Sequence, residues 1–201
     1  MSEKKLPVIT ITRQYAAYGR SVAKGLSARL GIPYYDRDVI RKAAAESGYS
    51  VEEIAQEGED IGKASSFLNT ILNSSAAYSS SHDKIFEAEK YAIIHFATAG
   101  PCIIVGRCAA QILKEAGIPA IDVLLYGEMQ YRCQHALEIG EYGRTDVKRY
   151  VARRDALRET FCKVYTGADI WDISNYDLCL DSCLLGPDTC VDIIEKVLEK
   201  Y

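Results

Sequence analysis

Short apolar segments alternate with longer amphipathic segments along most of the chain. Residues 6–13 and 102–105 are brief and rich in β-branched side chains, which is typical of strands buried in a parallel sheet. Residues 19–30 instead carry apolar side chains at helical spacing, and Gly31 and Pro33 follow as helix-ending signals. The pattern predicts five strands, at residues 6–13, 33–36, 102–105, 120–126 and 176–180. It predicts helices at 19–30, 36–48, 83–98, 129–139, 145–165 and 187–200, and another that ends near 115.

This alternation of strands and helices predicts an α/β fold built on a mostly parallel sheet with right-handed crossovers. Ligands of such sheets bind beyond the carboxyl ends of the strands. Three positions are therefore candidates for a binding site: the turn after Arg13, the region of Asp36, and Gly106-Arg107. We expect them to face one cleft.

Composition narrows the class of protein. The chain has 201 residues, of which 48% are hydrophobic and 26% charged, so it can bury a core and does not read as a disordered protein. Lys and Arg number 24 against 28 Asp and Glu, a net charge of −4, so there is no overall positive field to hold nucleic acid or an anionic membrane. Any anion site must be local. We find no secretory or membrane-spanning pattern and expect a cytoplasmic protein.

Cysteine and histidine usage argues against two further classes. The seven cysteines are odd in number and contain no Cys-x-x-Cys pair, which disfavours a disulfide framework and a zinc knuckle. We expect them to be reduced thiols. The three histidines, His82, His95 and His135, follow no metal-ligand spacing.

The turn after the first strand resembles a phosphate-binding loop. Residues 14–21 read QYAAYGRS and fit the pattern G-x-x-x-x-G-K-[ST] at Gly19 and Ser21, with Arg20 in place of lysine and Gln14 in place of the first glycine. Such a loop surrounds an anion with backbone N–H groups, while its cation and hydroxyl meet the terminal phosphates and Mg²⁺. The alternative is an ordinary strand-to-helix turn.

A basic segment lies within the acidic chain. Residues 141–163 hold seven Lys or Arg against four Asp or Glu, a local charge of +3. Several cations are four residues apart, where like charges on a helix repel unless an anion relieves them. The segment is either a solvated helix face or part of an anion site.

Several blocks together resemble the cytidylate-kinase-like family of bacterial proteins. No single block is decisive, but their order and spacing are specific and cover nearly the whole chain. The blocks are ITRQY (11–15) followed by Gly19-Arg20, LGIPYYDRDVI (30–40), DKIFEA (83–88), GPCIIVGR (100–107), YTG (165–167), WD (171–172) and NYDLCLD (175–181).

The resemblance implies a fold and a reaction similar to those of nucleoside monophosphate kinases. The implied fold is a P-loop, three-layer α/β/α domain with a five-stranded sheet. Its core would be residues 1–35, 83–140 and 175–201, with a helical acceptor-binding insertion at 36–82 and an arginine-bearing lid at 141–174. ATP would be the donor, with Mg²⁺, and CMP or dCMP the acceptor. The partners would be small nucleotides, with no nucleic acid and no membrane.

The resemblance also implies roles for individual residues. The donor nucleotide would be bound by Gln14, Tyr15, Ala16, Ala17, Tyr18, Gly19, Arg20 and Ser21, with Ser21 reaching Mg²⁺ through the nucleotide. The acceptor would be bound by Asp36, Arg41, Arg107, Asp155 and Arg158, and the catalytic arginines would be Arg20, Arg153, Arg154 and Arg158.

The loop departs from the family pattern. That pattern usually reads Gly-Ser-Gly-Gly-Arg, whereas this chain has Ala16-Ala-Tyr-Gly-Arg. Two alternatives therefore stay open: a nucleotide-binding protein that has lost catalysis and acts as a sensor or regulator, and a P-loop kinase of another small acceptor.

Overall fold

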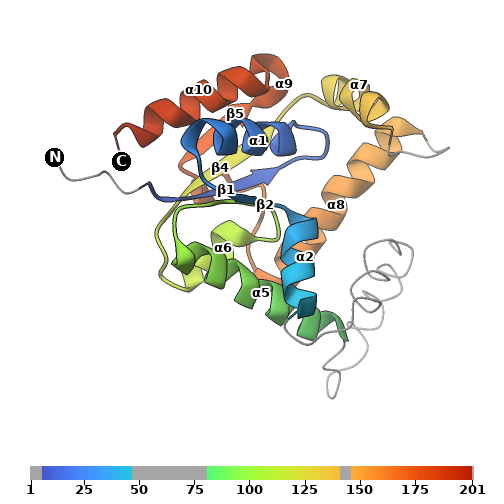
Figure 1. The fold of residues 1–201 in the computed structure, drawn as a ribbon. Helices are drawn as coiled ribbons and strands as arrows, with labels where there is room; N and C mark the ends of the chain where they lie inside the picture. Colours follow the sequence, from blue (N-terminus) through green and yellow to red (C-terminus); the bar gives the residue numbers. More distant parts are fainter. Residues whose placement is uncertain (1–5, 47–80, 141–145, 201) are drawn as a thin grey trace. The chain divides into compact units, whose positions relative to one another are not determined.

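The computed structural model describes residues 6–46, 81–140 and 146–200 (Figure 1). It divides the chain into two compact units, residues 1–37 with 93–201 and residues 38–92. Most of the predicted acceptor-binding insertion, residues 47–80, and the first part of the predicted lid, residues 141–145, lie outside the described residues.

The first unit is built on a five-stranded sheet. Its strands are β1 (Val8–Arg13), β2 (Tyr34–Tyr35), β3 (Ile103–Val105), β4 (Ala120–Tyr126) and β5 (Leu178–Asp181). They pair in the order β2-β3-β1-β4-β5, and every pair is parallel. The α/β fold with a five-stranded parallel sheet is therefore confirmed, and the apolar, β-branched sequence of β1 reflects its burial in the middle of the sheet.

The predicted helices are present with small changes at their ends. They are α1 (Gly19–Leu30), α2 (Arg37–Glu46), α5 (Ser81–Ala99), α6 (Ala109–Glu115), α7 (Met129–Ile139), α8 (Val147–Thr166) and α10 (Pro187–Leu198). Two short elements were not predicted, the 3-10 helix η1 (Ile173–Asn175) and α9 (Ser182–Leu185). Both are only one turn long and begin at an aspartate, Asp172 or Asp181, whose carboxylate accepts backbone N–H bonds.

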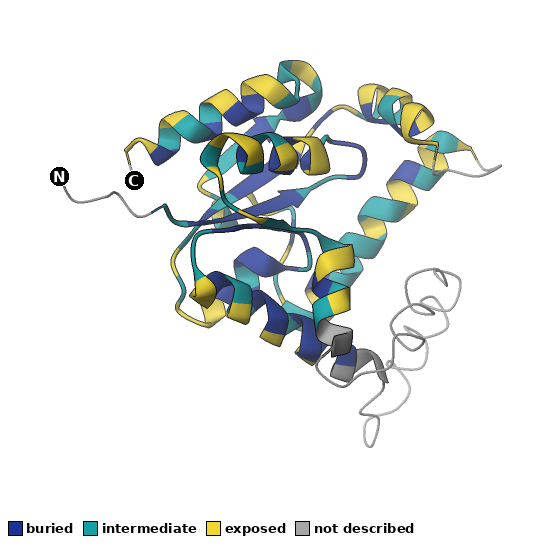
Figure 2. Ribbon diagram, viewed as in Figure 1, coloured by how far each residue is buried: buried dark blue, intermediate teal, exposed yellow. Residues whose placement is uncertain are grey.

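Helices cover both faces of the sheet and give the three layers of the fold (Figure 1). Ile9 and Ile11 of β1 point into a core shared with α1 and α10, and α6 lies against the other face of β1 and β4. Figure 2 shows the strands as the most buried part of the molecule. In the second unit, Arg41 of α2 pairs with the fully buried carboxylate of Glu89 on α5, at 3.3 Å.

Two chemical expectations can be compared with the described residues. All seven cysteines are free thiols, and four of them are buried. Among residues 6–46, 81–140 and 146–200, no helix is sufficiently long and apolar to cross a lipid bilayer.

A larger side chain at position 25 tests how tightly α1 packs against α10. A Cβ on Gly25 would lie 2.9 Å from Cγ2 of Val191, closer than side chains tolerate. We expect Gly25→Leu to lower the free energy of unfolding in urea by about 1–3 kcal/mol through overpacking. Ala28→Leu, at an exposed position of the same helix, is the control and should be nearly neutral. Equal effects of the two substitutions would contradict the tight contact, as would a failure of Val191→Ala to restore part of the loss.

Candidate functional site

The turn between β1 and α1 adopts an unusual backbone conformation. Ala16 and Tyr18 have φ angles of 60° and 54°, in the left-handed region. These are two of the positions at which the loop of the family that the sequence resembles has glycine. A non-glycine residue in this conformation costs about 1–2 kcal/mol of conformational free energy. The loop thus has positive φ at both positions without the residue that favours it.

Three consecutive carbonyl groups of this loop are held by side chains from the C-terminal half of the chain. The Tyr15 carbonyl accepts from Nη1 of Arg132 at 3.3 Å, the Ala16 carbonyl from Nδ1 of His135 at 2.8 Å, and the Ala17 carbonyl from Oγ of Ser182 at 2.8 Å. Because a trans peptide places N–H opposite C=O, the following N–H groups are directed away from these side chains. The Ala17 N–H donates to the carbonyl of Gln14 at 3.4 Å. Backbone N–H groups of such a loop can hold an anion where they face a common point.

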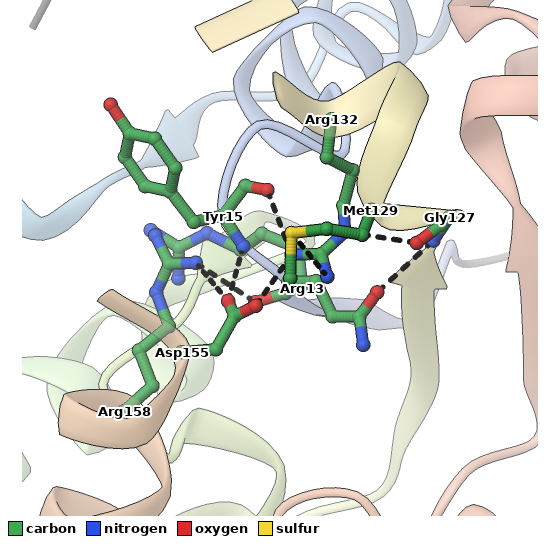
Figure 3. A network of polar contacts seen from close by, with 8 residues as sticks. Arg13, Tyr15, Gly127, Met129, Arg132, Asp155 and Arg158 are labelled. Carbon is green, nitrogen blue, oxygen red and sulfur yellow. Dashed lines mark hydrogen bonds and ion pairs between the residues drawn. The ribbon is translucent and has the colours of Figure 1, made fainter. Parts of the chain in front are cut away.

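Helix α8 contacts the loop through Asp155 (Figure 3). Its carboxylate accepts the N–H of Tyr15 at 2.6 Å and pairs with Nη1 of Arg132 at 2.5 Å. Arg132 is only 4% exposed, and its Nε donates to the carbonyl of Gly127 at 2.9 Å, so one buried guanidinium joins α7, the end of β4, the loop and α8. Arg158, one turn after Asp155, donates to the carbonyl of Arg13 at 3.3 Å.

Five guanidinium groups gather at the carboxyl edge of the sheet, and we call them the arginine cluster: Arg13, Arg20, Arg37, Arg107 and Arg158. Burial lowers the pKa of Arg13 well below its ordinary value, and the other four members lower it further by charge repulsion. Burial also lowers the pKa of Arg158 to about 10 against the opposing effect of Asp155. An anion bound beside Arg13 and Arg158 would offset both the burial and the repulsion of these two cations.

The turn after β3 forms the other side of this edge. Gly106, Arg107 and Cys108 have φ angles of 78°, 56° and 55°, three left-handed residues in succession. Left-handed conformations at non-glycine residues are costly and concentrate at functional sites. The Arg107 guanidinium lies over the ring of Phe161 of α8, 4.8 Å from its centroid, which places the α8 helix beside this turn as well.

The structure brings most of the predicted donor and acceptor residues together. Residues 14–21 form the loop and the first turn of α1, with Ser21 exposed. Nη2 of Arg20 pairs with Oδ2 of Asp36 at 3.0 Å, so a donor-side and an acceptor-side candidate are in contact. Tyr18 stacks on His135 with ring centroids 3.8 Å apart.

The predicted lid arginines differ in their surroundings. Arg154 and Arg158 lie over the ring of Tyr15, at 5.4 and 5.5 Å, whereas Arg153 is an exposed residue of α8.

Two predicted acceptor-binding residues already have partners of their own. Arg41 belongs to the second unit, where it pairs with Glu89. Asp155 contacts the loop, so reading an acceptor base would require it to exchange its bonds to Tyr15 and Arg132.

Sequence reasoning missed five residues of this region: Arg13, Arg37, Arg132, His135 and Ser182. Arg13 carried a signal, because it is the only charged residue of β1 and ends that strand. Arg132, His135 and Ser182 carried none, since each acts by reaching a loop carbonyl more than 110 positions away.

Glycine substitutions in the loop test its backbone conformation. Ala16 and Ala17 are both buried, but only Ala16 has a positive φ. We expect Ala16→Gly to leave the protein about 1–2 kcal/mol more stable than Ala17→Gly, because glycine removes the strain at position 16 alone. Urea unfolding of the two variants measures this difference. Equal stabilities would contradict the left-handed conformation of Ala16.

Removal of the Asp155 carboxylate tests the contact between α8 and the loop. Asp155→Ala leaves the buried Arg132 cation without this partner, and we expect the free energy of unfolding to fall by about 3–5 kcal/mol. Glu159→Ala, an exposed acid on the same helix, should cost little. Adding Arg132→Met to Asp155→Ala should recover much of the loss, and additive effects of the two changes would contradict their pairing.

The chain is similar to known proteins both in sequence and in fold. The chain is 24% identical over 135 residues to a cytidylate kinase of Methanococcus maripaludis (strain C5 / ATCC BAA-1333), a match that covers 66% of this chain and 75% of the relative. An uncharacterized protein from Eubacterium ventriosum ATCC 27560 shares the fold with a TM-score of 0.70 at 20% identity, over 97% of this chain and 99% of that one.

A shikimate kinase from Acinetobacter baumannii, solved in complex with shikimate, also shares the fold. Its TM-score is 0.58 at 10% identity, over 98% of this chain and 95% of that chain. The fold is therefore that of P-loop kinases. The model of the cytidylate kinase-like family matches residues 8–183, and the chain belongs to that family.

Proposed function

We propose that the protein transfers a phosphoryl group from ATP to a nucleoside monophosphate, with CMP or dCMP as the preferred acceptor. The observation that carries this proposal is the loop after β1, whose carbonyls at Tyr15, Ala16 and Ala17 are each held by a side chain. Family membership supports it. Phosphoryl transfer needs little covalent chemistry from the protein and depends on alignment and on cations around the transferring group.

The donor side would consist of the loop and the start of α1. Backbone N–H groups of residues 15–19 would surround the β- and γ-phosphates, with the Arg20 guanidinium in the place of the usual lysine. Ser21 is exposed in the first turn of α1 and offers a hydroxyl. Within the described ranges no three His, Cys, Asp or Glu side chains gather to hold a metal. Mg²⁺ would therefore be bound chiefly by the phosphates of ATP, with Ser21, and would neutralise charge on them.

The acceptor side would use cations from other strand ends. Arg107 after β3 and Arg158 of α8 would bind the acceptor phosphate, because guanidinium groups match phosphate oxygens in bidentate fashion. Asp36 would orient Arg20, to which it is paired at 3.0 Å. Asp155, 3.6 Å from Arg158, would give up this cation to the acceptor phosphate, and Arg153, Arg154 and Arg41 would contact the nucleotides.

One observation favours a second candidate, a nucleotide-binding sensor without turnover. The Asp155 carboxylate already accepts the Tyr15 N–H at 2.6 Å, where an incoming phosphate oxygen would compete with it. A loop in which this contact persisted would bind nucleotide without aligning it for transfer.

A coupled assay with ATP, Mg²⁺ and each nucleoside monophosphate tests the kinase. We expect turnover, fastest with CMP or dCMP, and a loss of about 100-fold or more in kcat for Arg20→Met. The control is Arg29→Met on the same helix, because Arg29 pairs with Asp192 and Glu195 on the surface. Calorimetry should detect ATP binding in the wild type. Binding of ATP without turnover would favour the sensor. Turnover only with a phosphate-free metabolite would favour a kinase of another small acceptor. The absence of both ATP binding and turnover would refute the proposal.

A further inference from the structure

Arg13 occupies a position between the donor and acceptor sides of the candidate site. It is the last residue of β1, the central strand, and immediately precedes the phosphate loop. Its aliphatic stem packs on Gly19, where a Cβ would lie 2.7 Å from Cγ of Arg13. Its guanidinium packs on Gly106 after β3, where a Cβ would lie 1.8 Å from Nη1. Glycine at these two positions leaves the room that this side chain fills.

The surroundings of the Arg13 guanidinium are electrostatically one-sided. Arg158, Arg37, Arg107 and Arg20 are all close enough to act on its charge. Among the residues that the structure describes, no carboxylate forms an ion pair with it, whereas Arg20 has Asp36, and Arg132 and Arg158 have Asp155. A half-buried cation among like charges destabilises the free protein. An anion bound at this strand end would offset the cost of placing the Arg13 cation there.

Neither the donor motif nor the acceptor motif includes this residue. Arg20 belongs to the end of the loop pattern and Arg107 to the acceptor turn, but Arg13 touches the backbone of both sides. A group that passes from donor to acceptor crosses the space between these sides. It carries its negative charge on three equatorial oxygens while the attacking and leaving oxygens are in line.

We propose that Arg13 is a further catalytic residue, whose guanidinium binds the phosphoryl group in passage between the two nucleotides. The proposal rests on the proposed function. The bond from the γ-phosphorus to the β–γ bridging oxygen breaks, and a bond to a phosphate oxygen of the acceptor monophosphate forms. The leaving oxygen departs with ADP. No proton is needed, because the acceptor oxygen is already ionised, and Arg13 stays protonated throughout.

Arg13→Met tests this role, because methionine keeps much of the side-chain volume and removes the charge. Three measurements are needed: unfolding without ligand, calorimetric binding of inorganic pyrophosphate, and steady-state kinetics with ATP and the best monophosphate. We expect stability equal to or above that of the wild type, since repulsion is removed. Pyrophosphate affinity should fall about 10-fold or more. The kcat should fall about 100-fold or more, with both KM values changed much less. Arg29→Met is the matched control and should change none of the three.

The outcomes separate this inference from the proposed function. Turnover by the wild type with an unchanged kcat in Arg13→Met overturns the role of Arg13 and leaves the kinase intact. No turnover by the wild type, with pyrophosphate binding that depends on Arg13, overturns the kinase and retains the phosphate site. Lower stability of Arg13→Met with wild-type pyrophosphate affinity marks Arg13 as a structural cation and overturns the inference.

A second variant covers the case in which Arg13→Met does not fold. Arg13→Lys keeps the cation but loses the planar fork that binds two oxygens at once. We expect it to fold and to lower kcat about 10-fold or more, which corresponds to the loss of one well-placed hydrogen bond in the transition state. A kcat equal to that of the wild type would overturn the inference.

Discussion

Repulsion among guanidinium groups at the carboxyl edge of the sheet is the constraint on which the rest of the site depends. Parallel strands deliver the residues that follow them to one edge, and here those residues include Arg13, Arg37 and Arg107. Helix α8 adds Arg158 and helix α1 adds Arg20. Asp36 and Asp155 offset part of this charge. Burial, with repulsion from neighbouring cations, lowers the pKa of both Arg13 and Arg158.

The loop between β1 and α1 shows how tertiary contacts replace a local preference. Glycine normally allows the positive φ angles that Ala16 and Tyr18 adopt. Strained residues persist when their surroundings over-determine them. Here Arg132, His135 and Ser182 each fix one carbonyl of the loop, and His135 also stacks on Tyr18. Because a carbonyl oxygen only accepts, Nδ1 of His135 carries the hydrogen in that contact.

Hydrophobic periodicity was sufficient to predict the sheet and its helices, because each is a response to burial. It also placed the turn after Arg13, Asp36 and Gly106-Arg107 at one edge, since this follows from parallel strand direction alone. The contacts of Arg132, His135 and Ser182 could not be predicted, because they depend on how α7 and the start of α9 approach a loop far away in sequence. The short α9 was missed because its single turn depends on the Asp181 cap and has no periodicity to detect.

Asp155 connects the loop to the charge of the arginine cluster. It accepts the Tyr15 N–H, neutralises the buried Arg132 and lies 3.6 Å from Arg158, so one carboxylate performs in the free protein what a phosphate would do on binding. A nucleotide phosphate arriving at the loop would offer its oxygens to the same N–H group and to Arg158. Asp155 would keep Arg132, its closest ion-pair partner. The proposed reaction therefore requires an exchange of one anion for another at Tyr15 and Arg158, while Arg132 continues to hold α7 and the loop in place.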